Sequence, residues 1–289
     1  MPGPIIGLLL GHYLKAILED LNPPAGVDLL RAAAFTQTPS SDASISPDEQ
    51  APTNILIRSY YRDSVRARRD ELLACLRLNA TNPYIGELHV LIEDATPPQE
   101  LRNAIPEDVQ RKLLPFPVSR RVTYRDLFDH ANRQGDRRKA IVANSDIWFD
   151  SSLQRLRRYD LEGKLLCLSR WDIQPNGRTL FYDCVTSQDA WIFQTPIREF
   201  YCDFFLGTPA CDNRLAWEAE HAGLIVSNPS LSIRANHLHL CSVRNYSPEH
   251  AIEGPHRSIR ATHLDNGLST IGDIAARIRV GLFSRAIGL

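Results

Sequence analysis

The stretch KAIVANSDIWFD, residues 139–150, decides how the rest of the chain is organised. Its apolar run at residues 141–143 is typical of a strand buried on both faces. The run ends in Asn144, Ser145 and Asp146, three small polar residues that favour a turn. Such a turn places Asp146 beyond the carboxyl end of a central strand, where open α/β sheets bind their ligands. A carboxylate there can hold a hard divalent cation and, through it, a diphosphate, although the segment taken alone is more typical of a plain strand-ending turn.

Apolar segments on both sides of this stretch predict an α/β fold. Strands are expected at residues 54–61, 87–92, 141–143, 164–169 and 224–226, with a short apolar segment at 189–193. Helices are expected between the first two strands and at residues 123–134, 151–159 and 212–222. Residues 96–117 are interrupted by prolines and are expected to be irregular. Strand, helix and strand at this spacing form right-handed parallel units, so the central sheet should be mostly parallel and flanked by helices.

Composition indicates an ordinary soluble globular protein. The 289 residues are 43% hydrophobic and 23% charged, and the formal net charge is -1. This charge gives no overall field toward nucleic acid or anionic membrane, so neither is an expected partner. The six cysteines form no CxxC pair and are expected to be reduced and buried. No segment has the length of an integral membrane span and the N-terminus lacks the features of a signal peptide, which together favour a cytoplasmic protein.

Four parts of the chain are expected. Residues 1–35 form an N-terminal helical appendage, and residues 36–53, rich in Ser, Pro and acidic side chains, a flexible linker. Residues 54–250 form the main domain. Residues 251–289 form a tail whose amphipathic helix packs on its own domain or, as the less favoured alternative, lies on a membrane surface.

Polar clusters stand at the ends of successive apolar segments, at residues 59–62, 93–94, 144–146, 187–189, 207–214 and 237–244. Parallel strands all finish on one edge of a sheet, so we expect these clusters to converge on one site. Seven segments in this order carry a resemblance: SYYRD, NxxNPYIGELHVLIED, ANSDIWFD, LSRWDI, SQDAWIF, GTPACDNRLAWEAEHAGLIVSNPS and HLH…RNY. They resemble a sparsely characterised glycosyltransferase-like family that is similar to GT-A fold nucleotide-sugar transferases. The resemblance spans residues 53 to 246 and implies a GT-A-like (Rossmann-like) sheet.

The resemblance also implies a metal site. The family's Asp-x-Asp motif would fall on residues 144–146, where Asn144 replaces the first acid and Asp146 remains as the ligand. A late histidine often completes such sites, and His237 or His239 would match it. Alternate residues of an extended segment face the same way, so both imidazoles can reach one cation. Oxygen and imidazole ligands suit Mn²⁺, with Mg²⁺ as the second choice; the alternative is that both histidines only hydrogen-bond the sheet edge.

Two aspartates are candidates for the catalytic base. The resemblance implies Asp212, at the start of a helix after the acceptor segment, a position that is also compatible with a plain N-cap. Asp189 is the rival base or a binder of sugar hydroxyls. Arg170 and Asp172 form either a wall of the pocket or an ordinary exposed ion pair.

The nucleotide should sit at the first strand ends, with the base near the first two side chains of the SYYRD motif. Acidic groups after the second strand can accept from the base or ribose, and guanidinium groups fit the diphosphate. The expected donor-binding residues are Ser59, Tyr60, Arg62, Glu93, Asp94, Asn144, Ser145 and Arg244.

The leading hypothesis is a metal-dependent, inverting, hexosyltransferase-like enzyme of the GT-A type. It moves a sugar from a nucleotide-sugar donor to a hydroxyl of a glycan, protein or small-molecule acceptor. Two alternatives stay open. One is an inactive glycosyltransferase-like binding or scaffold protein, motivated by Asn144, and the other is a metal-dependent nucleotide phosphohydrolase that uses water as the acceptor.

Overall fold

The computed structural model describes residues 54–242 and 250–264. The predicted appendage, linker and tail helix therefore lie outside the described residues, and so does Arg244. No helix in the described part of the chain has the length and hydrophobicity needed to cross a membrane. Residues 250–264 pack on the main domain, with Ile259 7% exposed in its core, so the packed unit extends beyond position 250.

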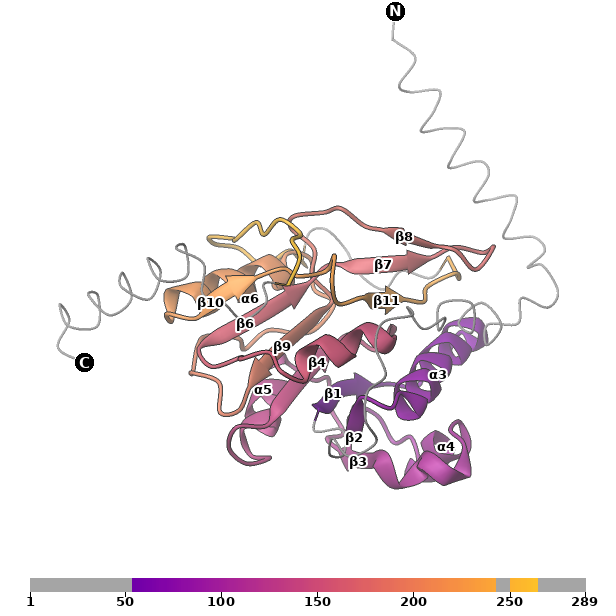
Figure 1. The fold of residues 1–289 in the computed structure, drawn as a ribbon. Coiled ribbons are helices and arrows are strands. Elements are labelled where there is room, and N and C mark those ends of the chain that lie inside the picture. The colour runs from indigo at the N-terminus through magenta and orange to yellow at the C-terminus, as the bar shows by residue number, and fades with distance from the viewer. Residues whose placement is uncertain (1–53, 243–249, 265–289) are drawn as a thin grey trace, which may run out of the picture.

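A seven-stranded sheet forms the centre of the molecule (Figure 1), in the order β10-β6-β9-β4-β1-β2-β3. Every neighbouring pair is parallel except the two that β9 makes with β4 and β6, which are antiparallel. The strands are β1 (Asn54–Tyr60), β2 (Ile85–Ile92), β3 (Leu113–Pro117), β4 (Lys139–Ala143), β6 (Lys164–Leu168), β9 (Ala190–Gln194) and β10 (Ile225–Ser227). The expected fold class, a mostly parallel α/β sheet flanked by helices, is confirmed.

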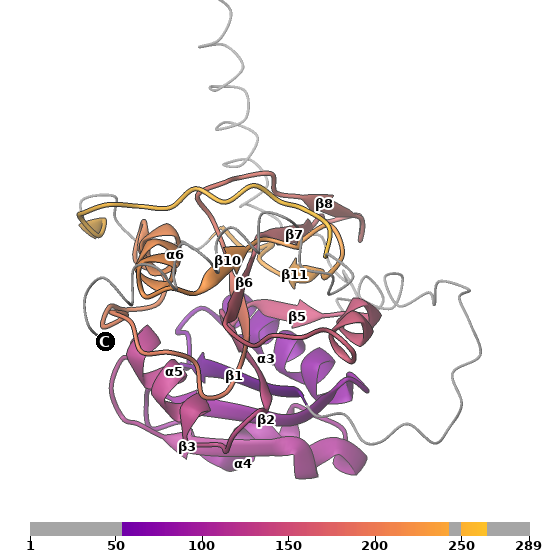
Figure 2. The same cartoon turned by 60° about the vertical axis from the view of Figure 1, so that its left-hand side comes forward.

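A second, four-stranded sheet was not expected from the sequence. Its order is β5-β11-β7-β8, with β11 antiparallel to β5 and parallel to β7. Its strands are β5 (Ile147–Phe149), β7 (Arg170–Ile173), β8 (Thr179–Phe181) and β11 (Ala235–His237). Trp148, Ile173 and the adjacent Leu238 pack against Cys75 and Leu78 of α3 (Arg66–Thr81), which fixes the small sheet to the main domain. Figure 2 shows β5 of this sheet beside α3.

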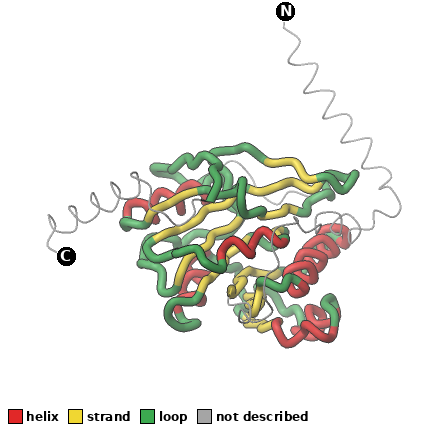
Figure 3. Tube along the Cα trace, viewed as in Figure 1, coloured by secondary structure: helices red, strands yellow, loops and turns green. Residues whose placement is uncertain are grey.

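Helices cover both faces of the central sheet (Figures 1 and 3). Alternate β1 side chains enter opposite cores, because successive residues of a strand point to opposite faces. Leu56 packs with α3, α4 (Pro98–Asn103) and the 3₁₀ helix η3 (Ser151–Leu156). Ile57 packs with α5 (Tyr124–Asn132) and α6 (Cys211–His221).

Two local predictions were wrong. Residues 96–117 are not irregular but form α4, the 3₁₀ helix η2 (Glu107–Lys112) and β3. Prolines are compatible with these elements because Pro98 lies in the first turn of α4 and β3 is an edge strand. The helix expected at 151–159 is only η3, although Asp150 does cap it by accepting from the Ser152 amide at 2.9 Å.

Four of the cysteines are buried as expected, namely Cys75, Cys167, Cys202 and Cys211. None of the six cysteines, all of which lie in the described ranges, forms a disulfide.

Candidate active site

The carboxyl edge of the central sheet brings together residues from three of the predicted polar clusters. Residues 144–146 follow β4 and residue 59 lies near the end of β1. Asp189 joins them because β9 runs antiparallel to its neighbours, so its beginning lies at the edge where the others end. The backbone N–H of Asn144 donates to the Asp189 carbonyl at 3.0 Å. The backbone N–H of Asp189 donates to the Leu168 carbonyl at 2.8 Å. The strand ends and the start of β9 are therefore joined directly.

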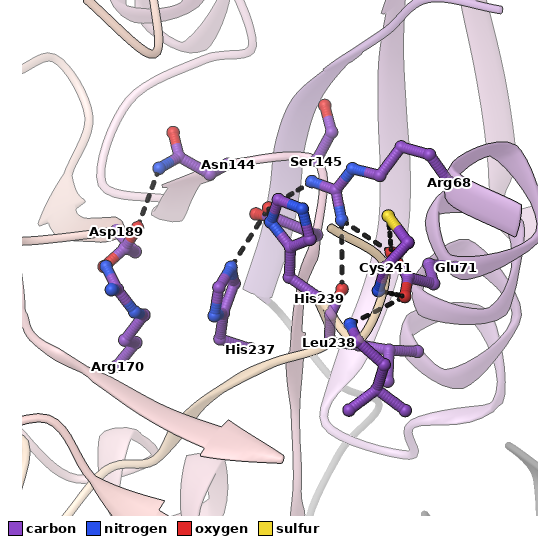
Figure 4. A network of polar contacts seen from close by, with 12 residues as sticks. Arg68, Glu71, Asn144, Ser145, Arg170, Asp189, His237, Leu238, His239 and Cys241 are labelled. Carbon is purple, nitrogen blue, oxygen red and sulfur yellow. Dashed lines mark hydrogen bonds and ion pairs between the residues drawn. The ribbon is translucent and has the colours of Figure 1, made fainter. Parts of the chain in front are cut away.

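The small sheet brings His237 to Asp146. In the β5–β11 pair, Ile147 lies opposite His237, so the residue before β5 faces the end of β11. His237 Nε2 lies 3.2 Å from Asp146 Oδ2 and His239 Nδ1 lies 3.9 Å from the same oxygen. Figure 4 shows His237 and His239 side by side at this point. The three side chains predicted as metal ligands thus lie together, between 10% and 14% exposed.

Asp172 holds His237 from the other side. The β11–β7 register places the two residues opposite each other, and Asp172 Oδ1 lies 2.7 Å from His237 Nδ1. Burial alone lowers the pKa of His237, but the carboxylates of Asp146 and Asp172 outweigh it and raise the pKa to about 9. Arg170 Nε in turn donates to Asp172 at 2.9 Å. Arg170 and Asp172 of the LSRWDI segment are therefore connected to His237.

A buried arginine, which the sequence analysis did not single out, also contacts Asp146. Arg68 Nη2 lies 2.5 Å from Asp146 Oδ2, and its Nη1 lies 2.9 Å from Glu71 Oε2 and 3.2 Å from the Leu238 carbonyl. Burial favours the neutral form of Asp146, but His237 and Arg68 outweigh that effect and hold its pKa well below the usual range. Asp146 is therefore ionised at every physiological pH.

The second half of the site contains two carboxylates close to each other. Asp189 accepts from Asn144 Nδ2 at 3.0 Å and from Arg170 Nη1 at 3.3 Å. Asp212 accepts from the Gln188 amide at 3.0 Å. Burial and the nearby charge of Asp189 raise the pKa of Asp212 to about 6. An acid with this pKa is mostly ionised at neutral pH and is still basic enough to accept a proton.

Asp212 is not the N-cap of α6, contrary to the sequence analysis. The helix begins at Cys211, and the cap is Ala210, which has a left-handed backbone with φ 65° and makes no side-chain cap bond. Asp212 lies in the first turn, and its carboxylate accepts from the Gln188 amide before β9. The predicted end of this helix is correct, because Gly223 adopts φ 87° just after it.

The donor-binding candidates fall into two groups. Ser59 and Ser145 lie together, with their hydroxyl oxygens 3.3 Å apart and Ser145 Oγ donating to the Ser59 carbonyl at 2.7 Å. Glu93 lies next to Ser59, and burial raises the pKa of this glutamate. Arg58, which is fully buried, donates from Nη2 to the Ser145 carbonyl. These residues join the end of β1 to the turn that carries Asp146.

Three further candidates make other contacts. Tyr60 is completely buried in the core beneath α3 and α4. Asp94 closes a local turn by accepting from the Thr96 amide at 2.8 Å and from the Arg62 amide. The Arg62 side chain is half-exposed and lies 3.4 Å from Glu100.

The donor set at Asp146 fits a divalent cation. Cis ligands on Mg²⁺ or Mn²⁺ lie about 3 Å apart when each bond is about 2.1 Å, and the His237–Asp146 separation of 3.2 Å matches that spacing. The three candidate ligand atoms lie within 4.8 Å of one another. A metal-binding histidine usually gives its other nitrogen to a carboxylate, as His237 does to Asp172. With Asn144 in the motif, Asp146 supplies the one carboxylate of this set.

No protein-family model matches the chain, and no curated protein matches it. The solved structures to which it is similar include the mannosyltransferase PcManGT from Pyrobaculum calidifontis in complex with GDP-Man and Mn²⁺, at 13% identity and a TM-score of 0.45, covering 80% of this chain and 67% of that one. S. aureus TarS matches at 14% identity and a TM-score of 0.43, over 65% of this chain and 37% of that one. TarS 1-349 in complex with UDP-GlcNAc matches at 10% identity and a TM-score of 0.38, over 80% and 66%. Similarity this low assigns no activity, which has to come from the site itself.

Proposed function

We propose that this protein transfers a sugar from a nucleotide-sugar donor to an acceptor hydroxyl. One observation carries the proposal: a cation-type ligand set and a carboxylate with a raised pKa lie on the same sheet edge. Polar contacts run from Asp146 through His237, Asp172 and Arg170 to Asp189. The negative charge of Asp189 helps to raise the pKa of Asp212. Such a site can neutralise a leaving diphosphate at one end and accept a proton at the other.

Asp146, His237 and His239 would hold the divalent cation, with Mn²⁺ favoured by the mixed oxygen and imidazole donors. When bound, the cation acts as a Lewis acid for the diphosphate. Ser59, Ser145 and Glu93 lie at the neighbouring end of β1, where their hydroxyls and carboxyl can bind the nucleoside.

Asp212 is the proposed base for an inverting transfer. The acceptor oxygen forms a bond to the anomeric carbon, the bond from that carbon to the phosphate oxygen breaks, and the diphosphate leaves with the electron pair. Asp212 takes the proton that the acceptor hydroxyl loses. Asp189 is better suited to bind sugar hydroxyls and to raise the pKa of Asp212, because Arg170 and Asn144 already engage its two oxygens.

A second candidate is a nucleotide-binding protein without turnover. The observation that favours it is the engagement of Asp146 by Arg68, which already neutralises the carboxylate of the metal motif. Such a protein would bind nucleoside diphosphates and would convert no donor.

A thermal-shift screen followed by a transfer assay tests the proposal. Ligands that bind only the folded state raise the melting temperature. We expect a nucleoside diphosphate with Mn²⁺ to raise it more than either alone. Product formation from the matching nucleotide-sugar, abolished by D212N, supports the transferase. Nucleoside diphosphate binding with no consumption of any donor supports the second candidate, and release of free sugar without an acceptor supports a hydrolase.

A further inference from the structure

Arg68 occupies the carboxylate oxygen that a divalent cation needs. Its Nη2 lies 2.5 Å from Asp146 Oδ2, the oxygen that also faces His237 and His239. The Arg68 side chain is 7% exposed, so little solvent screens its charge from a neighbouring ion. A guanidinium and a metal ion at the same oxygen repel each other and compete for the same lone pairs.

Arg68 has a second anchor that does not depend on Asp146. Its Nη1 donates to Glu71 Oε2 at 2.9 Å and to the Leu238 carbonyl at 3.2 Å. Glu71 Oε1 accepts from the backbone amides of Leu240 and Cys241 at 2.7 and 2.9 Å. The arginine, the glutamate and the segment that carries both histidines therefore form one unit fixed to α3. Nη1 can keep these two bonds while the guanidinium turns and moves Nη2 away from Asp146.

A diphosphate is a suitable new partner for that N–H group. Guanidinium groups form strong charge-assisted hydrogen bonds to phosphate oxygens. Arg68 lies beside the ligand set that would bind the same diphosphate through a cation, so the donor would arrive next to it.

We propose that Arg68 and the divalent cation are mutually exclusive partners of Asp146, and that the donor diphosphate drives the exchange by accepting the guanidinium N–H that Asp146 gives up. The inference rests on the proposed function and adds a coupling between the binding of the metal and the binding of the nucleotide. Without nucleotide, Arg68 keeps metal affinity low. With nucleotide, metal and diphosphate bind with positive coupling, because each removes a cost from the binding of the other.

Calorimetric titration of the full chain with Mn²⁺, with and without UDP or GDP, tests this. The variants are R68Q, which removes the competing charge, and R66Q, a matched control on the same helix whose side chain is 85% exposed and pairs with Asp70. In wild type and R66Q, we expect the nucleoside diphosphate to tighten Mn²⁺ binding about tenfold or more. In R68Q, we expect Mn²⁺ alone to bind about tenfold tighter and the gain from nucleotide to shrink.

The proposal is overturned if R68Q without nucleotide binds Mn²⁺ no more tightly than wild type does. It is also overturned if R68Q loses metal binding while its circular dichroism spectrum stays native. If R68Q does not fold, R68K decides. A single ammonium lacks the fork that reaches Glu71, Leu238 and Asp146 together, so Mn²⁺ should bind tighter than in wild type, and an unchanged affinity contradicts the competition. The proposed function fails separately if the metal-only results hold but no nucleoside diphosphate binds.

Discussion

Two buried carboxylates on one sheet edge have opposite acidities. Asp146 lies between Arg68 and His237, and these cations hold its pKa well below the usual range. Asp212 lies beside another carboxylate, and burial together with Asp189 raises its pKa to about 6. Burial acts in the same direction on both groups, so the neighbouring charges make the difference. One edge of the sheet therefore provides both a permanent anion that can hold a cation and a group that can exchange a proton.

The largest effect is expected when Asp146 is removed. D146A leaves Arg68 and His237 buried without the carboxylate they share, so unfolding free energy should fall by about 3–5 kcal/mol. Mn²⁺ binding and turnover should be lost as well. Chemical denaturation and calorimetry measure both quantities. D70N, at an exposed carboxylate of α3, is the control that should change neither. If D146A kept its stability and still bound Mn²⁺, Asp146 would be neither the proposed metal ligand nor the anion that stabilises Arg68 and His237.

Asp212 should behave in the opposite way. In D212N, the rate should fall about 10²- to 10⁴-fold because the proton acceptor is gone. The melting temperature at pH 8 should be unchanged or higher, because the substitution removes a buried charge beside Asp189. Steady-state kinetics and thermal melts provide the two readouts. D203N, at a half-exposed carboxylate, is the control. A strongly destabilised D212N contradicts the assignment.

A smaller effect is expected at Asp172, which contacts His237 without belonging to the proposed ligand set. D172N removes the carboxylate from His237 Nδ1, so Mn²⁺ affinity should fall about 10- to 100-fold. Titration in the presence of nucleoside diphosphate measures the change. Unaltered affinity would mean that His237 needs no support from β7 or does not bind the metal.

The smallest effect is a shift in pH dependence. Asp212 must be ionised to act as a base, so kcat/KM should rise with pH through about 6. In D189N the like charge is gone, and this acidic limb should move to lower pH. The stability linkage has the opposite sign: a carboxyl with a raised folded pKa contributes stability below its unfolded pKa, and loses that contribution as pH rises through about 6. If the acidic limb of the kcat/KM profile stays at the same pH in D189N, the charges of Asp189 and Asp212 are not coupled.

The sequence was informative about the central strands and about the position of the proposed metal ligands. Long apolar runs predicted β1, β2, β4 and β6, and the polar residues after β4 predicted where Asp146 lies. Alternation in the HLH segment correctly placed His237 and His239 on one side. The same alternation predicts that Tyr60, four residues after Leu56, faces the same core, as it does.

The small sheet and the buried arginines were not predictable in the same way. Strands β5 and β11 have three residues each, too few for a periodic pattern. Arg68 belongs to a helix rich in charged residues, and the sequence does not distinguish it from the exposed Arg66 or the partly buried Arg69 on the same helix. Its burial depends on Asp146, which is far away in the sequence. Arg58 gave a signal that went unused, a single charge inside the apolar run of β1.

The most direct test of the central claim is electron spin echo spectroscopy of Mn²⁺ bound to the full chain with UDP or GDP. We expect hyperfine coupling to imidazole nitrogen in wild type and R66Q, and its loss or reduction in H237A and H239A variants that keep a native circular dichroism spectrum. Bound Mn²⁺ without nitrogen coupling, or coupling that survives both substitutions, would contradict this claim.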